Sequence, residues 1–405
     1  MNPKSLSLTL KAALIAAALG FATSAQAAPQ IRPEVGKPLQ EAQKLIGDKN
    51  YKEALARISA AEQTAGSKIS PYETYVIGRM RGVADLGIGD TNGAMAAFEA
   101  ALKSGQTPDG EKLSSLQTLA QLAYSAKNFP KAIEYIGQYK AAGGNNPQIT
   151  GLLAQAYYLG GKYPEAAQEI KAQLQKSGQA PSETQLQLLA SCALKQNDAN
   201  GYVEALQLLV SYHPKPSYWL DLIARTAGSK GFSDRLSLDL ARLRYASGTL
   251  STAGDYLDAA QLALQAGFPG EADQYVKAGY AKNALGQGSD APRHARLKAL
   301  VEKKIAEDQK TLAEGEKAAQ KQASGDALVN TGLNYVGYQQ YDKGIALIEQ
   351  GIAKGNLKYA NEAKLHLGYA QVLAGQKAKA QATLRGVQGS DGTASVAKLW
   401  MIRAR

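Results

Sequence analysis

The chain has 405 residues, of which 45% are hydrophobic and 20% are charged, and its formal net charge is +11. At about 150 residues per domain, this length fits two or three ordinary domains or one long repeat array. The hydrophobic fraction excludes a chain that is disordered throughout. A single Cys in the whole sequence excludes a disulfide framework and a multi-Cys metal site.

The N-terminal 27 residues have the pattern of a cleavable secretory signal. A positively charged start is followed by an apolar run over residues 12–21. The small residues Ala25 and Ala27 frame a cleavage site, which predicts a cut between Ala27 and Ala28. An uncleaved anchor is less favoured, because spanning a bilayer takes about 20 apolar residues. We therefore expect residues 1–27 to be a signal peptide and the mature chain to have no transmembrane segment.

A helix–turn–helix pattern recurs along most of the chain. Its clearest copy spans residues 153–167, with an amphipathic helix, a tight turn at Gly160 and Gly161, and a second helix opened by Tyr163. The small residue near the start of the second helix recurs at Ala54, Ala94, Ala132, Ala166, Ala205, Ala272, Gly344 and Ala380. Two of the steps are about twice the others, which predicts degenerate units near Leu238 and Asp308. The sequence thus predicts about ten units with a mean step of about 36 residues.

This pattern resembles the tetratricopeptide repeat (TPR) family, in which each unit is a pair of antiparallel helices. The resemblance covers roughly residues 37–388 and implies an all-α, superhelical solenoid of helix–turn–helix units. It also implies that a small residue of the first helix meets a small residue of the second where the two cross. The expected pairs are Ala120 with Ala132, Ala154 with Ala166, Ala260 with Ala272, and Gly368 with Ala380.

One segment departs from the repeat. Residues 291–323 mix Lys and Arg with Asp and Glu around a thin apolar stripe, which is typical of one long helix or of two short-looped ones. In the last helix, Val396, Leu399 and Trp400 share one face and should cover the final repeat. The predicted organisation is a signal peptide over 1–27, a linker over 28–36, a front array over 37–286, a charged helical connector over 287–325, rear units over 326–388 and a capping helix over 389–405.

Sequence signatures of catalysis are weak. No phosphate-binding Gly-rich loop, His-Glu-x-x-His motif or Gly-x-Ser-x-Gly motif is present. Cys192 lies on an apolar helix face and is expected to be a buried, inert thiol. His213, His294 and His366 are far apart in sequence, and the last two are expected to face solvent. We therefore predict no catalytic, cofactor-binding or metal-binding residue and no enzymatic activity; an enzyme with a composite site between repeats is the least supported alternative.

The resemblance also implies where a partner would bind. In the TPR family the first helix of each unit lines the concave face, at positions set by the crossing residue. In two front units these positions hold Gln117, Gln121, Tyr124, Gln155 and Tyr158, whose amides and rings suit an extended peptide. In the rear units they hold Val329, Leu333, Val336, Leu365, Tyr369 and Val372, an apolar stripe that suits an amphipathic helix. The alternative is that neighbouring helices cover both sets.

The sequence therefore predicts a non-enzymatic scaffold or adaptor that binds proteins or peptides and serves cell-envelope assembly or transport. We expect it in the periplasm or, alternatively, as a secreted protein. A second hypothesis follows from the C-terminal end, because Lys and Arg outnumber Asp and Glu by nine to two between Gly351 and Arg405. That end would suit an anionic envelope component such as polysaccharide or peptidoglycan. No cofactor is expected, nor a nucleic-acid partner, which an exported protein seldom meets.

Overall fold

The computed structural model describes residues 30–405, apart from the side chain of Ser177, and within this range it contains helices and no strand. The predicted signal peptide, with its cleavage site between Ala27 and Ala28, lies outside the described residues. The chain divides into two compact units between Ser177 and Gly178. Among the described residues, no helix combines the length and the apolar character that a membrane span needs.

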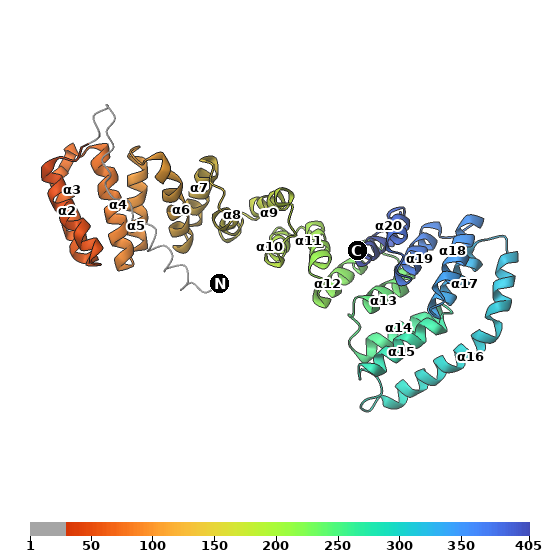
Figure 1. The fold of residues 1–405 in the computed structure, drawn as a ribbon. Helices are drawn as coiled ribbons and strands as arrows, with labels where there is room; N and C mark the ends of the chain where they lie inside the picture. The colour runs from red at the N-terminus through yellow and green to blue at the C-terminus, as the bar shows by residue number, and fades with distance from the viewer. Residues whose placement is uncertain (1–29) are drawn as a thin grey trace. The chain divides into compact units, whose positions relative to one another are not determined.

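The first unit consists of helical hairpins (Figure 1). A residue with positive φ closes the turn within each hairpin: Lys49, Gly89, Lys127 or Gly161. The paired helices are α2 (Pro33–Gly47) with α3 (Tyr51–Ala65), α4 (Pro71–Ile88) with α5 (Thr91–Lys103), α6 (Asp109–Ser125) with α7 (Phe129–Ala141), and α8 (Pro147–Leu159) with α9 (Tyr163–Ser177).

The second unit contains further hairpins of the same kind. They are α10 (Glu183–Lys195) with α11 (Ala199–Tyr212), α14 (Ala253–Gln265) with α15 (Pro269–Ala281), α17 (Asp326–Gly337) with α18 (Tyr341–Lys354), and α19 (Ala360–Leu373) with α20 (Lys377–Arg385). At the degenerate unit near Leu238, α12 (Pro216–Ala227) and α13 (Ser237–Ala246) are separated by a 3-10 turn, Asp234–Leu236, and pack loosely. The unit near Asp308 is no hairpin, because α16 (Ala291–Lys321) is one continuous helix. Residues 30–405 therefore hold eight close-packed hairpins, with the loose pair α12–α13 and the single helix α16 at the places of the two degenerate units.

Small residues occupy the helix crossings, as predicted. The paired positions on both helices are buried: Ala120, Ala132, Ala154, Ala166, Ala260, Ala272, Gly368 and Ala380. In the α4–α5 hairpin the two helices approach closely, since a Cβ on Gly78 would lie 2.6 Å from the carbonyl oxygen of Ala97. Larger side chains at these places would push the helices apart. The chain is thus an all-α array of TPR-like hairpins.

Helix α16 joins parts of the second unit rather than separating two arrays. It packs against α14, α15 and α17, with Val301 buried, and Figure 1 shows it passing from α15 to α17. A carboxylate of α16, that of Asp308, accepts a 2.8 Å hydrogen bond from Tyr338 Oη at the end of α17. The division of the chain therefore falls inside the predicted front array (37–286) and not at the predicted connector (287–325). Most charges of α16 are exposed, whereas Asp308 and Glu316 bond to tyrosines at the packed side, beside its thin apolar stripe.

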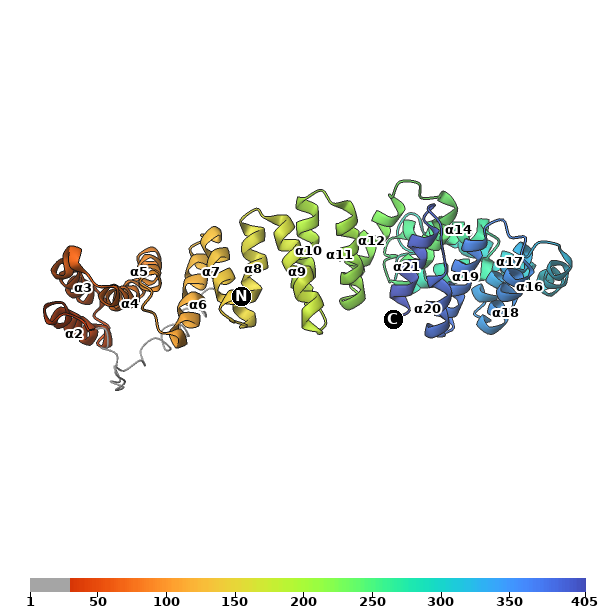
Figure 2. The same ribbon diagram turned by 90° about the horizontal axis from the view of Figure 1, so that it is seen from above.

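The C-terminal helix α21 (Thr393–Arg403) closes the second unit. Val396, Leu399 and Trp400 are at most 1% exposed, so they cover the last hairpin as predicted. The helix packs on α19 and α20 and also on α11 and α13, which come far earlier in the chain (Figure 2). The second unit therefore curls until its end meets its beginning.

Candidate functional site

The predicted peptide-binding residues of the first unit lie on two neighbouring helices, α6 and α8. Tyr124 Oη donates a 2.8 Å hydrogen bond to Gln155 Oε1 and so links the two helices. The Gln155 side chain is exposed, whereas Gln117, Gln121 and Tyr158 are half-buried. The structure thus brings together Tyr124 and Gln155, residues that the sequence placed in different repeats.

The two tyrosines of this face are anchored at the hairpin turns. The ring of Tyr124 packs edge-on against Phe129 at 6.0 Å between centroids, and Tyr158 packs against Tyr163 at 5.4 Å. Burial raises the pKa of Tyr124. Tyr124 therefore stays a neutral hydrogen-bonding group while its ring supports the turn.

Gln121 leaves one acceptor unmatched beside this pair. Its Oε1 is buried and has no hydrogen-bond partner among the described residues. An unmatched buried polar atom costs about 1–3 kcal/mol, and a ligand or a water molecule would remove that cost. The amide nitrogen of Gln155 remains free, because only its oxygen accepts from Tyr124. The face therefore offers an acceptor, the Gln121 oxygen, and two N–H donors on the amide nitrogen of Gln155.

A charged cluster extends this face toward α4. Tyr75 Oη donates to Glu111 Oε2 at 2.8 Å, and Arg79 Nη1 lies 2.8 Å from the same oxygen. The Arg79 guanidinium also lies 5.6 Å from the centroid of the Tyr75 ring. Sequence reasoning missed this cluster. Arg79 lies three residues before Gly82, just as Gln117 lies three before the crossing residue Ala120, so the same offset applied to α4 would have found Arg79 but not Tyr75 or Glu111.

The apolar stripe predicted for the rear units does not exist as a surface. Five of its residues are buried, and only Val372 is half-buried; the five are Val329, Leu333, Val336, Leu365 and Tyr369. Val336 and Val329 pack at the crossing of α17 and α18, where they meet Gly344 and Gly351. The predicted helix-binding stripe is therefore wrong, and the alternative in which neighbouring helices cover it holds.

Tyr369 shows why this stripe is covered. Its ring lies 5.0 Å from that of Trp400 on α21 and 4.8 Å from the guanidinium of Arg242 on α13. Both partners come from elements that the curled second unit brings onto α19. Local sequence periodicity carries no information on such long-range contacts.

A buried ionic network lies at the place where α13, α15 and α19 meet. Arg242 donates two hydrogen bonds of 2.8–2.9 Å to Glu271 and one of 2.9 Å to Asp239. Glu271 also accepts a 2.6 Å bond from Tyr275, and His366 Nε2 lies 3.2 Å from Asp239 Oδ1. Burial alone would raise the pKa of Asp239, but His366 and Arg242 lower it to about 2. The network therefore holds paired charges across three helices.

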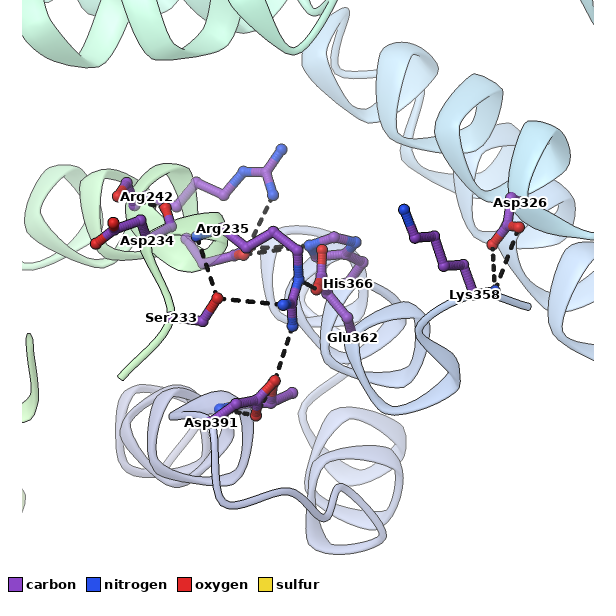
Figure 3. A network of polar contacts seen from close by, with 12 residues as sticks. Ser233, Asp234, Arg235, Arg242, Asp326, Lys358, Glu362, His366 and Asp391 are labelled. Carbon is purple, nitrogen blue, oxygen red and sulfur yellow. Dashed lines mark hydrogen bonds and ion pairs between the residues drawn. The ribbon is translucent and has the colours of Figure 1, made fainter. Parts of the chain in front are cut away.

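Arg235 forms a second, more exposed connection in the same region (Figure 3). Its guanidinium lies 2.8 Å from Glu362 and 2.7 Å from Asp391, and it stacks on the Tyr359 ring at 3.9 Å. Ser233 N adds a 2.9 Å hydrogen bond to the carbonyl oxygen of Asp391. These contacts fasten the segment before α13 to α19 and to the turn before α21.

The structure contradicts the predicted exposure of two histidines and confirms the predicted burial of the cysteine. His294 and His366 were predicted to face solvent; instead His294 is 4% exposed and accepts from Gly286 N, and His366 pairs with Asp239. Cys192 is fully buried as predicted, and burial raises the pKa of its thiol to about 11. Within residues 30–405, no group of three or more His, Cys, Asp or Glu is placed to hold a metal ion.

The basic C-terminal end keeps several exposed cations. Both of its acids, Glu362 and Asp391, pair with Arg235. Lys377 and Arg403 bond to backbone carbonyl oxygens, those of Arg405 and Ala246. The exposed cations of this end for which the structure shows no carboxylate partner include Lys364, Lys379, Arg385 and Lys398.

Comparison with known proteins gives no family model and no curated protein that matches the chain. Solved structures that resemble it include Naa15/Naa10 bound to HypK-THB, with 16% identity over 90% of this chain and a TM-score of 0.33; this chain spans 58% of that one. A tetratricopeptide repeat protein from Parabacteroides merdae has 12% identity over 84% of this chain and all of its own, with a TM-score of 0.31. Yeast Tom70 has 12% identity over 87% of this chain and 84% of its own, with a TM-score of 0.25. The repeat fold rests on the hairpins and crossings of the chain itself.

Proposed function

We propose that this protein is a non-enzymatic scaffold that binds an extended peptide segment of a partner protein along α4, α6 and α8 of its first unit. The observation that carries the proposal is the unmatched Gln121 Oε1 beside the Tyr124–Gln155 hydrogen bond. A buried acceptor without a partner favours any ligand that brings an N–H group to it. Repeat arrays commonly present such surfaces to other polypeptides.

The chemistry of this face favours an extended peptide over a helix. In a helix the central backbone groups bond to one another, so the backbone of a helical ligand could not match the Gln121 oxygen and the Gln155 amide nitrogen. An extended backbone presents free N–H and C=O groups in alternation. The half-buried Tyr124 and Tyr158 rings supply apolar area for its side chains. Arg79 and Glu111 supply charges at the α4 end of the same face.

The proposed setting is the periplasm, in envelope assembly or transport. This part of the proposal is supported by the sequence of residues 1–27, which has a charged start, an apolar run and the small residues Ala25 and Ala27. Fractionation of expressing cells and N-terminal sequencing of the purified protein test it. The expected N-terminus is Ala28. A protein that keeps residues 1–27 and stays in the cytoplasm would rule the setting out.

Site-directed photocrosslinking tests the binding face in cells. A photoreactive amino acid replaces Gln155 on α8 in one variant and Gln168 on α9 in the matched control; both side chains are exposed and belong to the same hairpin. We expect the Gln155 variant to give a discrete crosslinked protein that mass spectrometry identifies and the Gln168 variant to give none. Equal crosslinking from both positions, or from neither, would contradict the assignment of this face.

A second candidate function is the binding of an anionic envelope polymer by the C-terminal end. It is supported by the pairing of Glu362 and Asp391 with Arg235, which leaves exposed cations without a carboxylate. Sedimentation with purified peptidoglycan tests it, using a Lys379→Gln, Arg385→Gln, Lys398→Gln variant. We expect binding that falls steeply with added salt and is lost in the variant. Salt-insensitive binding, or binding unchanged in the variant, would exclude this function.

A further inference from the structure

A pocket of about 410 Å³ opens between α3, α4 and α5 of the first unit. On α4 its lining residues fall on one stripe, which includes Gly78, Arg81 and Asp85. Tyr75 and Arg79, which contact Glu111 of α6, belong to a different stripe of α4. The pocket is therefore separate from the proposed peptide-binding face.

Three of the four ionic side chains in this pocket are already satisfied. Arg81 Nε donates a 2.8 Å hydrogen bond to Glu62 Oε1, and Arg81 Nη2 donates to Ser59 Oγ at 2.9 Å. Asp90 caps the N-terminus of α5, where its Oδ1 accepts a 2.9 Å bond from the backbone of Gly93. Arg81 and Glu62 therefore neutralise each other, and Asp90 is engaged in capping α5. The fourth ionic side chain of the pocket is Asp85.

Asp85 is a buried carboxylate without a partner. The residue is 5% exposed, and its backbone carbonyl accepts a 2.8 Å hydrogen bond from Asp90 N, but its carboxylate has no hydrogen bond or ion pair among the described residues. Its Oδ2 would lie 3.0 Å from a Cβ on Gly93, so the room in front of the carboxylate exists because residue 93 is glycine. Burial raises its pKa; Arg81 lowers it, and Asp90 and Glu62 raise it further. A carboxylate in this position is stabilised by a cation that enters the pocket.

The rest of the lining fits the stem of such a cation. Ile69, Ala96 and Ala100 form an apolar wall, and Ile69 is a large hydrophobic side chain that is 37% exposed. A flexible aliphatic chain can lie along such a wall while its charged end reaches a buried acceptor. Beyond the Glu62–Arg81 pair, the pocket carries two carboxylates and no cation.

We propose that this pocket binds an alkylammonium group, with Asp85 as the acceptor of a charge-assisted hydrogen bond and with the stem against Ile69, Ala96 and Ala100. Both a lysine side chain of a partner polypeptide and a free aliphatic amine carry this group. An ammonium group has three N–H donors, so it can bond to Asp85 and also to Oδ2 of Asp90, the oxygen that does not cap α5. The site adds a second recognition element to the first unit, independent of the peptide-binding face.

Titration of the purified protein with small amines tests this proposal. The probes are n-butylammonium, Nα-acetyl-lysine methylamide and, as a neutral control of similar shape, n-butanol. We expect both amines to bind saturably in amide NMR spectra, with the largest shifts in the turn between Asp85 and Gly93, and n-butanol to produce none of them. Absence of saturable shifts in this turn with either amine would overturn the proposal.

Two variants identify the acceptor. Asp85→Asn keeps the size of the side chain and removes its charge, so we expect affinity for both amines to fall about tenfold or more. The melting temperature should stay the same or rise, because an unpartnered buried charge is lost. Glu165→Gln on the exposed surface of α9 is the control and should leave binding unchanged. Unchanged amine binding in Asp85→Asn would overturn the proposal.

The same titration separates the two sources of the ammonium group. A lysine derivative that binds about tenfold more tightly than n-butylammonium would identify a lysine of a partner polypeptide, because only contacts to the peptide backbone distinguish the two probes. Equal affinities, with the diamine cadaverine binding as well, would identify free amines. Either result supports the alkylammonium site. Failure of this site would leave the photocrosslinking result at Gln155 unaffected.

Discussion

Arg242 connects more of the second unit than any local pattern around it indicates. Its side chain is 1% exposed and pairs with Asp239 on its own helix and Glu271 on α15. Its guanidinium also stacks on the rings of Phe268 and Tyr369, at 5.5 and 4.8 Å from their centroids. A buried ion pair of this kind is sensitive to the loss of one member, because the remaining charge stays buried without compensation.

Replacing Arg242 should destabilise the second unit strongly. In Arg242→Met, Glu271 loses its cation while Asp239 keeps only His366, so we expect the free energy of unfolding to fall by about 3–5 kcal/mol. Lys298→Met is the control, because Lys298 pairs with Glu302 on the exposed side of α16 and its loss should cost less than about 1 kcal/mol. Urea denaturation measures both values. Similar losses in the two variants would mean that the buried network contributes no more than a surface pair.

Residue type alone predicted the buried small residues but not this network. Ala and Gly recurring at a regular step indicate helix crossings, because only small side chains let helix axes approach closely. Arg242, Glu271 and His366 are instead residue types that are typical of exposed helix positions. Their burial depends on side-chain bonds between α13, α15 and α19, which no local spacing encodes.

At the scale of elements, α17 and α18 cross with a glycine on each helix at the point of contact. A Cβ on Gly332 would lie 2.6 Å from the carbonyl oxygen of Gly344, and a Cβ on Gly344 would lie 2.6 Å from that of Gly332. The two backbones are therefore in contact. Val336 fills the adjacent space, which is why it is core and not part of a binding stripe.

A pair of Gly→Ala substitutions tests this crossing. Gly344→Ala inserts a methyl group where backbone already lies, so we expect a loss of about 1–3 kcal/mol of stability. Gly315→Ala in α16 meets nothing within 4 Å and should stabilise the protein by about 0.5–1 kcal/mol, because alanine favours the helix. Thermal unfolding of both variants gives the comparison. A neutral Gly344→Ala would show that the helices can separate without cost.

The elements were largely predictable and their packing partners were not. The positions of the hairpins were predictable from pairs such as Ala120 with Ala132 and Ala154 with Ala166, because the two residues of each crossing are close in sequence. The spacing predicts a degenerate unit around Asp308, whereas the charged composition of residues 291–323 also allows one long helix, and the structure has that one helix. The spacing of the repeat gives only the number of residues between units, so it does not tell whether those residues form a hairpin or one straight helix.

For the molecule as a whole, the closure of the second unit is the main departure from a simple repeat array. In an array each repeat touches only its neighbours. Here α21 packs on α11 and α13, and Arg235 reaches Glu362 and Asp391 (Figure 3). The closure covers Tyr369 of the rear units with Trp400 and Arg242. In the first unit, by contrast, Gln155 remains exposed.

Truncation after Gly392 tests whether α21 maintains this closure. The truncated chain loses the buried Val396, Leu399 and Trp400, and with them the contacts of α21 with α13 and α19. Because α13 packs loosely on α12, it depends on α21, and we expect its amides to exchange faster with solvent while the melting temperature falls. Helices α2–α9 belong to the other compact unit and should keep their protection. Lys398→Ala, an exposed position on α21, is the control and should change neither quantity. If α13 stays as protected in the truncated chain as in the full one, then Arg235, Arg242 and their partners hold the unit closed without α21.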